Sequence, residues 1–140
     1  IVTAWARFLT GTVLLDLDRR SEAVEHFEAA VAEETAPMVL VLGICYLALL
    51  GKRTPDEARA LLEEHGPALP PEERIRAHLI IYRAGGRLDD LRSAYDLLRE
   101  WLESFPEGPR GTISQGFPLC RDVEEAWRDV PWDEKRRGTG

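Results

Sequence analysis

Residues 37–51 read PMVLVLGICYLALLG, and this stretch contains no charged side chain although 31% of the chain is charged. Such a segment needs an apolar environment on nearly every side. It fits a membrane span, a central strand of a sheet, or a helix enclosed by other helices. Each alternative predicts a different fold, so the choice among them decides the architecture.

Length argues against the first two alternatives. A spanning helix needs about 20 apolar residues, whereas Pro37 and the Gly-Lys-Arg sequence at 51–53 close this stretch earlier. The β-branched residues Val39, Val41 and Ile44 suit a buried strand, but strands usually run about 4–8 residues. The chain also has no second apolar stretch to pair with such a strand. We therefore expect a helix that other helices surround.

The flanking sequence has the spacing of those surrounding helices. Thr54, Pro55 and Glu57 form a helix-start pattern, in which Thr54 caps and Pro55 takes the first helical position. No segment alternates strictly between apolar and polar residues, so the chain is predicted to be all-α. Further helices are expected over residues 2–17, 21–31, 54–65, 70–85, 89–105 and 118–130.

The helices repeat along the chain. Ala23, Ala58 and Ala94 recur at intervals of 35 and 36 residues, each followed four positions later by a large apolar residue. The helices that precede them place Gly11 and Gly43 at matching positions, where a small residue lets two helices approach closely. Intervals of this length are typical of helix-turn-helix repeats.

This pattern resembles the tetratricopeptide repeat family over residues 2–106, best in the first repeat (Gly11, Leu14, Ala23, Phe27 and Ala30). The third repeat is degenerate, with His78 where a small residue is usual. The resemblance implies a helical-hairpin solenoid of about three antiparallel helix pairs plus a C-terminal helix. Residues 1–106 would form the repeats, residues 107–131 a linker and a helix packed on the array, and residues 132–140 a disordered tail. A generic helical bundle or a related α-solenoid is the structural alternative.

In such a solenoid, one side of the apolar helix would line a concave groove, where similar families bind peptides or partner proteins. An apolar groove of this kind needs a cover. The cover is either the chain's own C-terminal segment or another chain, which would be a second copy or a partner's amphipathic helix. The expected groove residues are Phe8, Thr12, Leu15, Leu40, Ile44, Leu47, Ile75, Leu79 and Tyr82, with Arg83 near one edge.

Chemistry-bearing residues are few and scattered. The histidines His26, His65 and His78 do not share a motif, and Cys45 and Cys120 lack the spacing of metal ligands. We expect no enzyme activity, no cofactor and no metal. A net charge of −7 makes nucleic acid and anionic membranes poor partners.

The sequence therefore predicts a non-catalytic protein-interaction module that binds a protein or peptide with an apolar or amphipathic segment. One alternative is a regulatory or sensor domain of a larger bacterial signalling protein or enzyme, because the chain starts in mid-pattern without Met. Another is a homo-oligomeric scaffold, for example a homodimer. Sixteen of the 18 basic residues are Arg, which suggests a bacterial source, and two reduced thiols suit the cytoplasm.

Overall fold

The computed structural model describes residues 3–33 and 36–137, and every regular element within these ranges is helical. This confirms the predicted all-α class. The described residues form nine α-helices and one 3₁₀ turn, Gly66–Ala68. The helices are α1 (Ala4–Asp16), α2 (Arg20–Ala32), α3 (Pro37–Leu49), α4 (Pro55–His65), α5 (Pro71–Gly85), α6 (Leu88–Glu103), α7 (Glu107–Gly116), α8 (Pro118–Arg128) and α9 (Trp132–Arg137).

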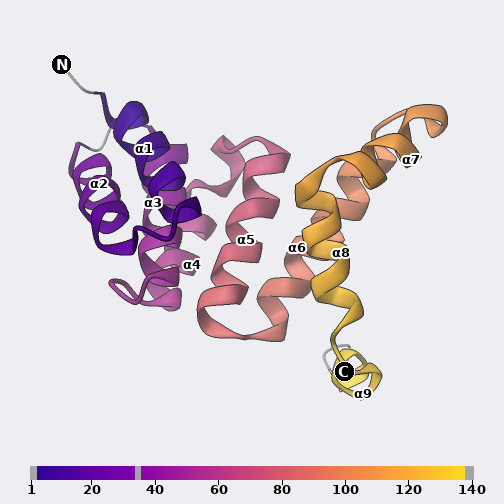
Figure 1. The fold of residues 1–140 in the computed structure, drawn as a ribbon. Coiled ribbons are helices and arrows are strands. Elements are labelled where there is room, and N and C mark those ends of the chain that lie inside the picture. The colour runs from indigo at the N-terminus through magenta and orange to yellow at the C-terminus, as the bar shows by residue number, and fades with distance from the viewer. Residues whose placement is uncertain (1–2, 34–35, 138–140) are drawn as a thin grey trace.

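Helices that follow one another in the chain pack side by side and form a row (Figure 1). α1 packs on α2, α3 packs on both α2 and α4, and α5 packs on α3, α4 and α6. Beyond α6, α8 packs against α6 and α7. The two ends of the chain lie at opposite ends of the row (Figure 1). This packing of sequential helix pairs is that of a helical array.

The charge-free stretch forms α3, and neighbours enclose this helix as predicted. α3 packs against α2, α4 and α5 and also contacts α1. Pro37 stands at its start, where the missing backbone N–H costs no hydrogen bond. Eight of its 13 residues are buried, namely Val39, Val41, Leu42, Gly43, Ile44, Cys45, Leu47 and Ala48.

Two glycines allow α2 to approach both of its neighbours closely. A Cβ atom at Gly11 of α1 would lie 2.8 Å from Cε1 of Phe27, a fully buried side chain of α2. A Cβ atom at Gly43 of α3 would lie 2.7 Å from Cγ2 of Val31, one turn further along α2. The expectation that these glycines serve close helix packing is confirmed.

The buried side chains form two clusters that meet at α5. Ala77, Ile80 and Ile81 belong to a first cluster shared with helices α1 to α4. Ile75 and Leu79 belong to a second cluster shared with α6 and α8. α5 therefore has two buried faces and joins the two halves of the array.

An ion pair between α4 and α6 spans the same junction. The guanidinium of Arg59 donates from Nε to Oδ1 of Asp90 (2.8 Å) and from Nη2 to Oδ2 (2.6 Å), and it also pairs with Asp56. The Asp90 side chain is only 5% exposed and that of Arg59 is 19% exposed. Hydrogen bonding to Asp90 raises the pKa of Arg59 above its usual value. This bidentate pair ties the second hairpin to the third.

The C-terminal third is more ordered than the sequence predicts. The expected linker forms α7 over Glu107–Gly116, and the expected disordered tail forms α9 up to Arg137, while residues 138–140 lie outside the described residues. The side chain of Trp127 holds α9 in place, with Lys135 Nζ 5.1 Å and Arg92 Cζ 5.2 Å from its ring. The predicted helix at 118–130 is confirmed as α8.

His78 lies on α5 near the Arg59–Asp90 pair, at the position that the sequence comparison aligned with Gly11 and Gly43. Its Nδ1 atom is buried and has no hydrogen-bond partner among the described residues. Burial lowers the pKa of His78, and Arg74 and Arg59 lower it further, while Asp90 acts in the opposite direction. The folded protein therefore favours the neutral imidazole.

We expect Gly11→Ala to lower the free energy of unfolding by about 1–3 kcal/mol, because the added methyl group overpacks the Phe27 ring. Urea unfolding followed by circular dichroism measures this loss. Gly108→Ala is the matched control, since a Cβ atom at Gly108 meets no described heavy atom within 4 Å. Equal stability of the two variants would contradict the close packing of α1 on α2.

We expect Asp90→Asn to destabilise the fold by about 2 kcal/mol or more. Removing one partner of a fully buried ion pair lowers the free energy of unfolding by about 3–5 kcal/mol. The loss is smaller here because Arg59 is partly exposed. Asp89→Asn is the control, because the Asp89 side chain is 73% exposed. If thermal unfolding shifts equally for both variants, the ion pair does not stabilise the junction.

The lowered pKa of His78 predicts a loss of stability in acid. Below 6.5, the ordinary pKa of histidine, the unfolded chain binds a proton at this residue before the folded chain does. The contribution of the neutral His78 side chain to the free energy of unfolding is complete above pH 6.5 and is lost as the pH falls. Unfolding free energies measured from pH 7.5 to pH 5 should therefore fall less steeply for His78→Gln than for the wild type. His65→Gln controls for the loss of an imidazole elsewhere.

Candidate functional site

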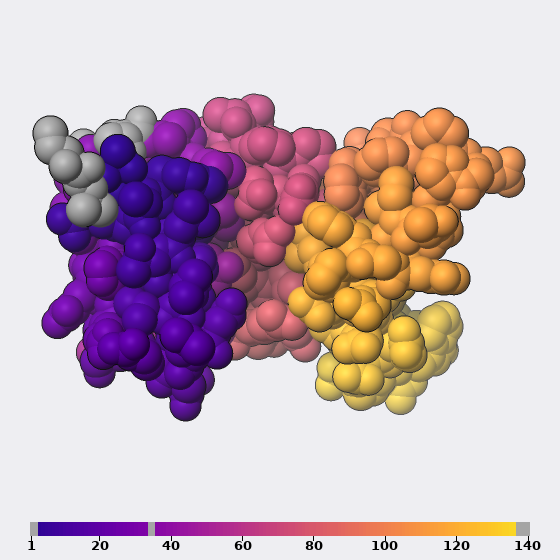
Figure 2. Space-filling view, turned by 45° about the horizontal axis from the view of Figure 1, so that its top comes forward, coloured from indigo at the N-terminus to yellow at the C-terminus, as the bar shows by residue number. Residues whose placement is uncertain are grey.

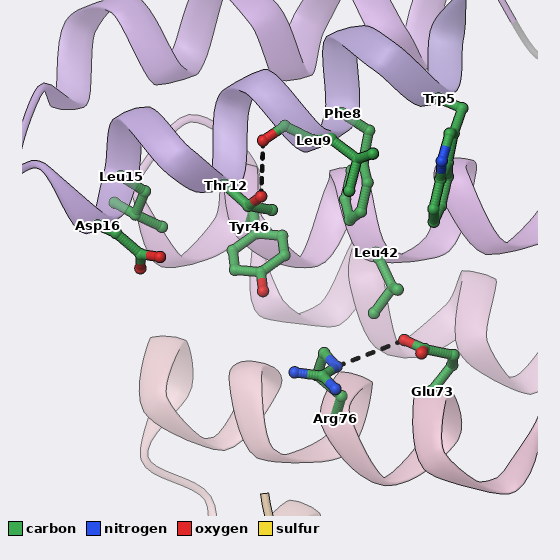
Figure 3. A pocket seen from close by; sticks show the side chains of 10 residues that line it. All are labelled: Trp5, Phe8, Leu9, Thr12, Leu15, Asp16, Leu42, Tyr46, Glu73 and Arg76. Atoms are coloured by element: carbon green, nitrogen blue, oxygen red, sulfur yellow. Dashed lines mark hydrogen bonds and ion pairs between the residues drawn. The ribbon is translucent and has the colours of Figure 1, made fainter. Parts of the chain in front are cut away.

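The face of the molecule in Figure 2 is hollowed between α1 and the C-terminal helices, with α5 set back between them. At the α1 side of this recess lies a hollow of about 380 Å³. α1 forms one wall, α3 forms the floor, and α5 forms the other wall (Figure 3). We call it the α1–α3–α5 hollow. It is lined by Trp5, Phe8, Leu9, Thr12, Leu15, Asp16, Leu42, Tyr46, Glu73 and Arg76.

A chain of aromatic rings runs from the rim of the hollow into the core. Trp5 stacks on Phe8 with 5.8 Å between ring centroids, and Phe8 lies 5.9 Å from Tyr46. Tyr46 in turn stacks on the buried ring of Phe27 at 5.0 Å. Because these rings pack on one another, the aromatic lining of the hollow is continuous with the core.

Polar groups stand opposite the rings. Arg76 of α5 pairs with Glu72 (Nη2 to Oε1, 3.0 Å) and with Glu73 (Nε to Oε2, 3.4 Å). On α1, the Thr12 hydroxyl donates to the Leu9 carbonyl at 2.7 Å. The charged side chains that line the hollow are Asp16, Glu73 and Arg76, so its carboxylates outnumber its single guanidinium.

Tyr46 brings a polar group to the apolar floor, and Figure 3 shows its hydroxyl on the side toward Arg76. Burial raises the pKa of Tyr46, Asp16 and Glu73 add to this rise, and Arg76 opposes it. The phenol is therefore neutral at physiological pH. Its hydroxyl makes no hydrogen bond with any described residue, so it is available to a bound molecule.

The structure brings only part of the predicted groove together. Phe8, Thr12 and Leu15 line the hollow. Ile44 and Leu47 are buried in the first cluster, and Leu40 is half-buried against that cluster. Ile75 and Leu79 are buried in the second cluster, against which Tyr82 packs, while Arg83 is exposed outside the hollow.

The open sides of α3 and α5 differ from those that the sequence predicts. On α3 the open side carries Leu42 and Tyr46, because Ile44 and Leu47 face other helices. On α5 the open side carries Glu73 and Arg76. Tyr46 is the one hydroxyl-bearing side chain in the apolar stretch, and this feature was the available signal for the site.

The chain's own C-terminal segment covers a different surface from the hollow. Leu119, Cys120 and Val123 of α8 pack in the second cluster with Ile75 and Leu79 of α5. α8 thus covers the α5 side chains that were expected to complete the groove. The residues that line the hollow all belong to α1, α3 and α5, and the hollow is open in Figure 2.

The remaining reactive side chains are inert or dispersed. Cys45 and Cys120 are buried free thiols, and burial raises the pKa of Cys45 to about 12. A thiol with so high a pKa is a poor nucleophile. Among the residues that the structure describes, no group of three or more His, Cys, Asp or Glu side chains could hold a metal ion.

The described residues form an all-helical array with an open hollow lined by aromatic side chains. Searches against protein-family models, curated proteins and solved structures find no match for this chain. Within residues 3–33 and 36–137, no helix is both long and apolar enough to cross a membrane.

Proposed function

We propose that the protein is a non-catalytic interaction module whose α1–α3–α5 hollow binds an amphipathic polypeptide segment. One observation carries the proposal. The hollow is open and has aromatic walls, and two of its polar groups, the Tyr46 hydroxyl and the Asp16 carboxylate, have no hydrogen-bond or ion-pair partner among the described residues. The bound segment would supply apolar side chains to the rings and a donor group to these oxygens.

The size of the hollow supports a polypeptide rather than a small molecule as its occupant. About 380 Å³ lies near the lower end of small-molecule sites, which usually enclose most of their ligand. This hollow instead lies at one side of a trough between α1 and the C-terminal helices (Figure 2). A helix laid in such a trough would place two or three side chains in the hollow while its polar face stays in water.

The charged side chains that line the hollow indicate which charge the bound polypeptide segment would carry. Asp16 and Glu73 outnumber Arg76 in the lining of the hollow, and Arg76 is already paired with Glu72 and Glu73. A cationic side chain beside the apolar anchor would meet Asp16 and the face of Trp5 or Tyr46. We therefore propose a segment that combines apolar anchors with lysine or arginine.

The resemblance to tetratricopeptide repeats agrees with this proposal, because similar domains bind peptides on the face formed by the first helix of each hairpin. α1, α3 and α5 are the first helices of their pairs in this chain. We further propose that the chain binds a partner protein as one domain of a larger bacterial protein in the cytoplasm.

Selection from a displayed library of helical peptides tests the proposal. The wild-type protein should enrich peptides that combine aromatic or aliphatic anchors with basic residues. Thr12→Trp should weaken the binding of the selected peptides by at least about tenfold, a loss of about 1.4 kcal/mol, because the indole fills the hollow. Isothermal titration calorimetry on individual peptides measures this change.

Thr112→Trp is the matched control, since Thr112 is exposed on α7, away from the hollow. It should bind the selected peptides as the wild type does, and circular dichroism should show both variants folded. Failure to enrich any peptide, or equal binding by the two variants, would overturn the proposal.

A further inference from the structure

α1 presents a row of exposed apolar side chains that the hollow does not account for. Trp5, Leu9, Val13 and Leu17 follow one another at four-residue spacing and are 45%, 43%, 57% and 62% exposed. They are four of the five large hydrophobic side chains that are exposed among the described residues. We call this row the α1 ridge. Trp5 and Leu9 also line the hollow, whereas Val13 and Leu17 do not.

The ridge lies on a face with few charges. Its nearest neighbours along the helix surface are Ala6, Thr10 and Thr12, with Asp16 at one edge and the exposed Asp18–Arg20 ion pair beyond Leu17. Most of the chain's solvent-facing helix positions carry charges, and the whole chain has a net charge of −7. An exposed apolar row of this kind marks a contact surface.

We infer that the α1 ridge is the contact surface of a homodimer, in which α1 packs antiparallel on α1 of a second copy. Side chains at four-residue spacing form a ridge that fits the grooves of a helix with the same spacing. An identical helix offers that spacing by definition. Two acidic copies also repel each other least through a face that is nearly uncharged.

The charge distribution of α1 selects the antiparallel orientation. Asp16, near the C-terminal end, forms no ion pair with any described residue, and the first turn of α1 contains no acidic residue. With the two-fold axis near residue 11, Asp16 of each copy lies beside the N-terminal turn of the other copy. That turn carries the positive end of the helix dipole. A parallel pair would instead place Asp16 against Asp16.

The ridge is about 18 Å long, from 12 residues at 1.5 Å per residue. A single helix face of this length gives an interface at the small end of specific complexes, below about 1,200 Å². The dimer should therefore dissociate in the micromolar range, with a dissociation constant on the order of 10 μM.

Sedimentation equilibrium over a concentration series tests the inference. The wild-type chain should shift from monomer to dimer, and Val13→Glu or Leu17→Glu should raise the dissociation constant at least about tenfold. Both residues are mostly exposed, so the variants should keep the wild-type unfolding midpoint. Trp132→Glu is the matched control, because Trp132 is the remaining exposed large hydrophobic residue and lies on α9.

Crosslinking with a short bis-maleimide tests the orientation. Thr10→Cys, near the axis, should crosslink efficiently, whereas the two copies of Leu17→Cys lie about 18 Å apart along the helices of an antiparallel pair and should not. Cys45 and Cys120 are buried and should react slowly. Efficient crosslinking at Leu17→Cys would overturn the antiparallel pairing.

A wild-type chain that stays monomeric, or a dimer that survives Val13→Glu, would overturn the α1 interface. Val13 and Leu17 lie outside the α1–α3–α5 hollow, so this result leaves the peptide-binding proposal intact.

Discussion

The enclosure of α3 is the constraint on which the rest of the structure depends. A helix without charge on any side is stable in water only when other helices cover it, and here α1, α2, α4 and α5 do so. Gly11 and Gly43 allow α2 to come close enough for the covering to be tight. A gap in this cover lies beside Leu42 and Tyr46, and this gap is the α1–α3–α5 hollow. The candidate site is thus a part of the core that the chain leaves open.

The same enclosure explains what could be predicted from the sequence and what could not. The existence and order of the helices follow from periodicity and from start signals such as Thr54-Pro55, whose cap forms through Thr54 Oγ1 and the Glu57 N–H. The open side of α3 does not follow, because a helix that is apolar all round has no periodicity to orient it. The prediction therefore chose Ile44 and Leu47, which are buried, and missed Tyr46.

The C-terminal third shows a second reason for differences from the prediction. Residues 107–117 contain three glycines and a proline, which favour a loop by local propensity. Pro109 lies in the first turn of α7, where proline is tolerated. α9 depends on Trp127, Arg92 and Lys135, which are up to 43 residues apart in the chain. Contacts between residues so far apart in the chain cannot be predicted from local sequence patterns.

The two buried faces of α5 have a consequence for how the protein folds. Because the first cluster and the second cluster share this helix, neither half of the array can complete its core until α5 is in place. α5 therefore acts as the coupling element of a quasi-linear array, in which stability passes from neighbour to neighbour. The ion pair of Arg59 and Asp90 adds a polar link across the same boundary. Loosening this boundary would turn one cooperative unfolding transition into two, with α6 to α9 and α1 to α4 melting as separate units.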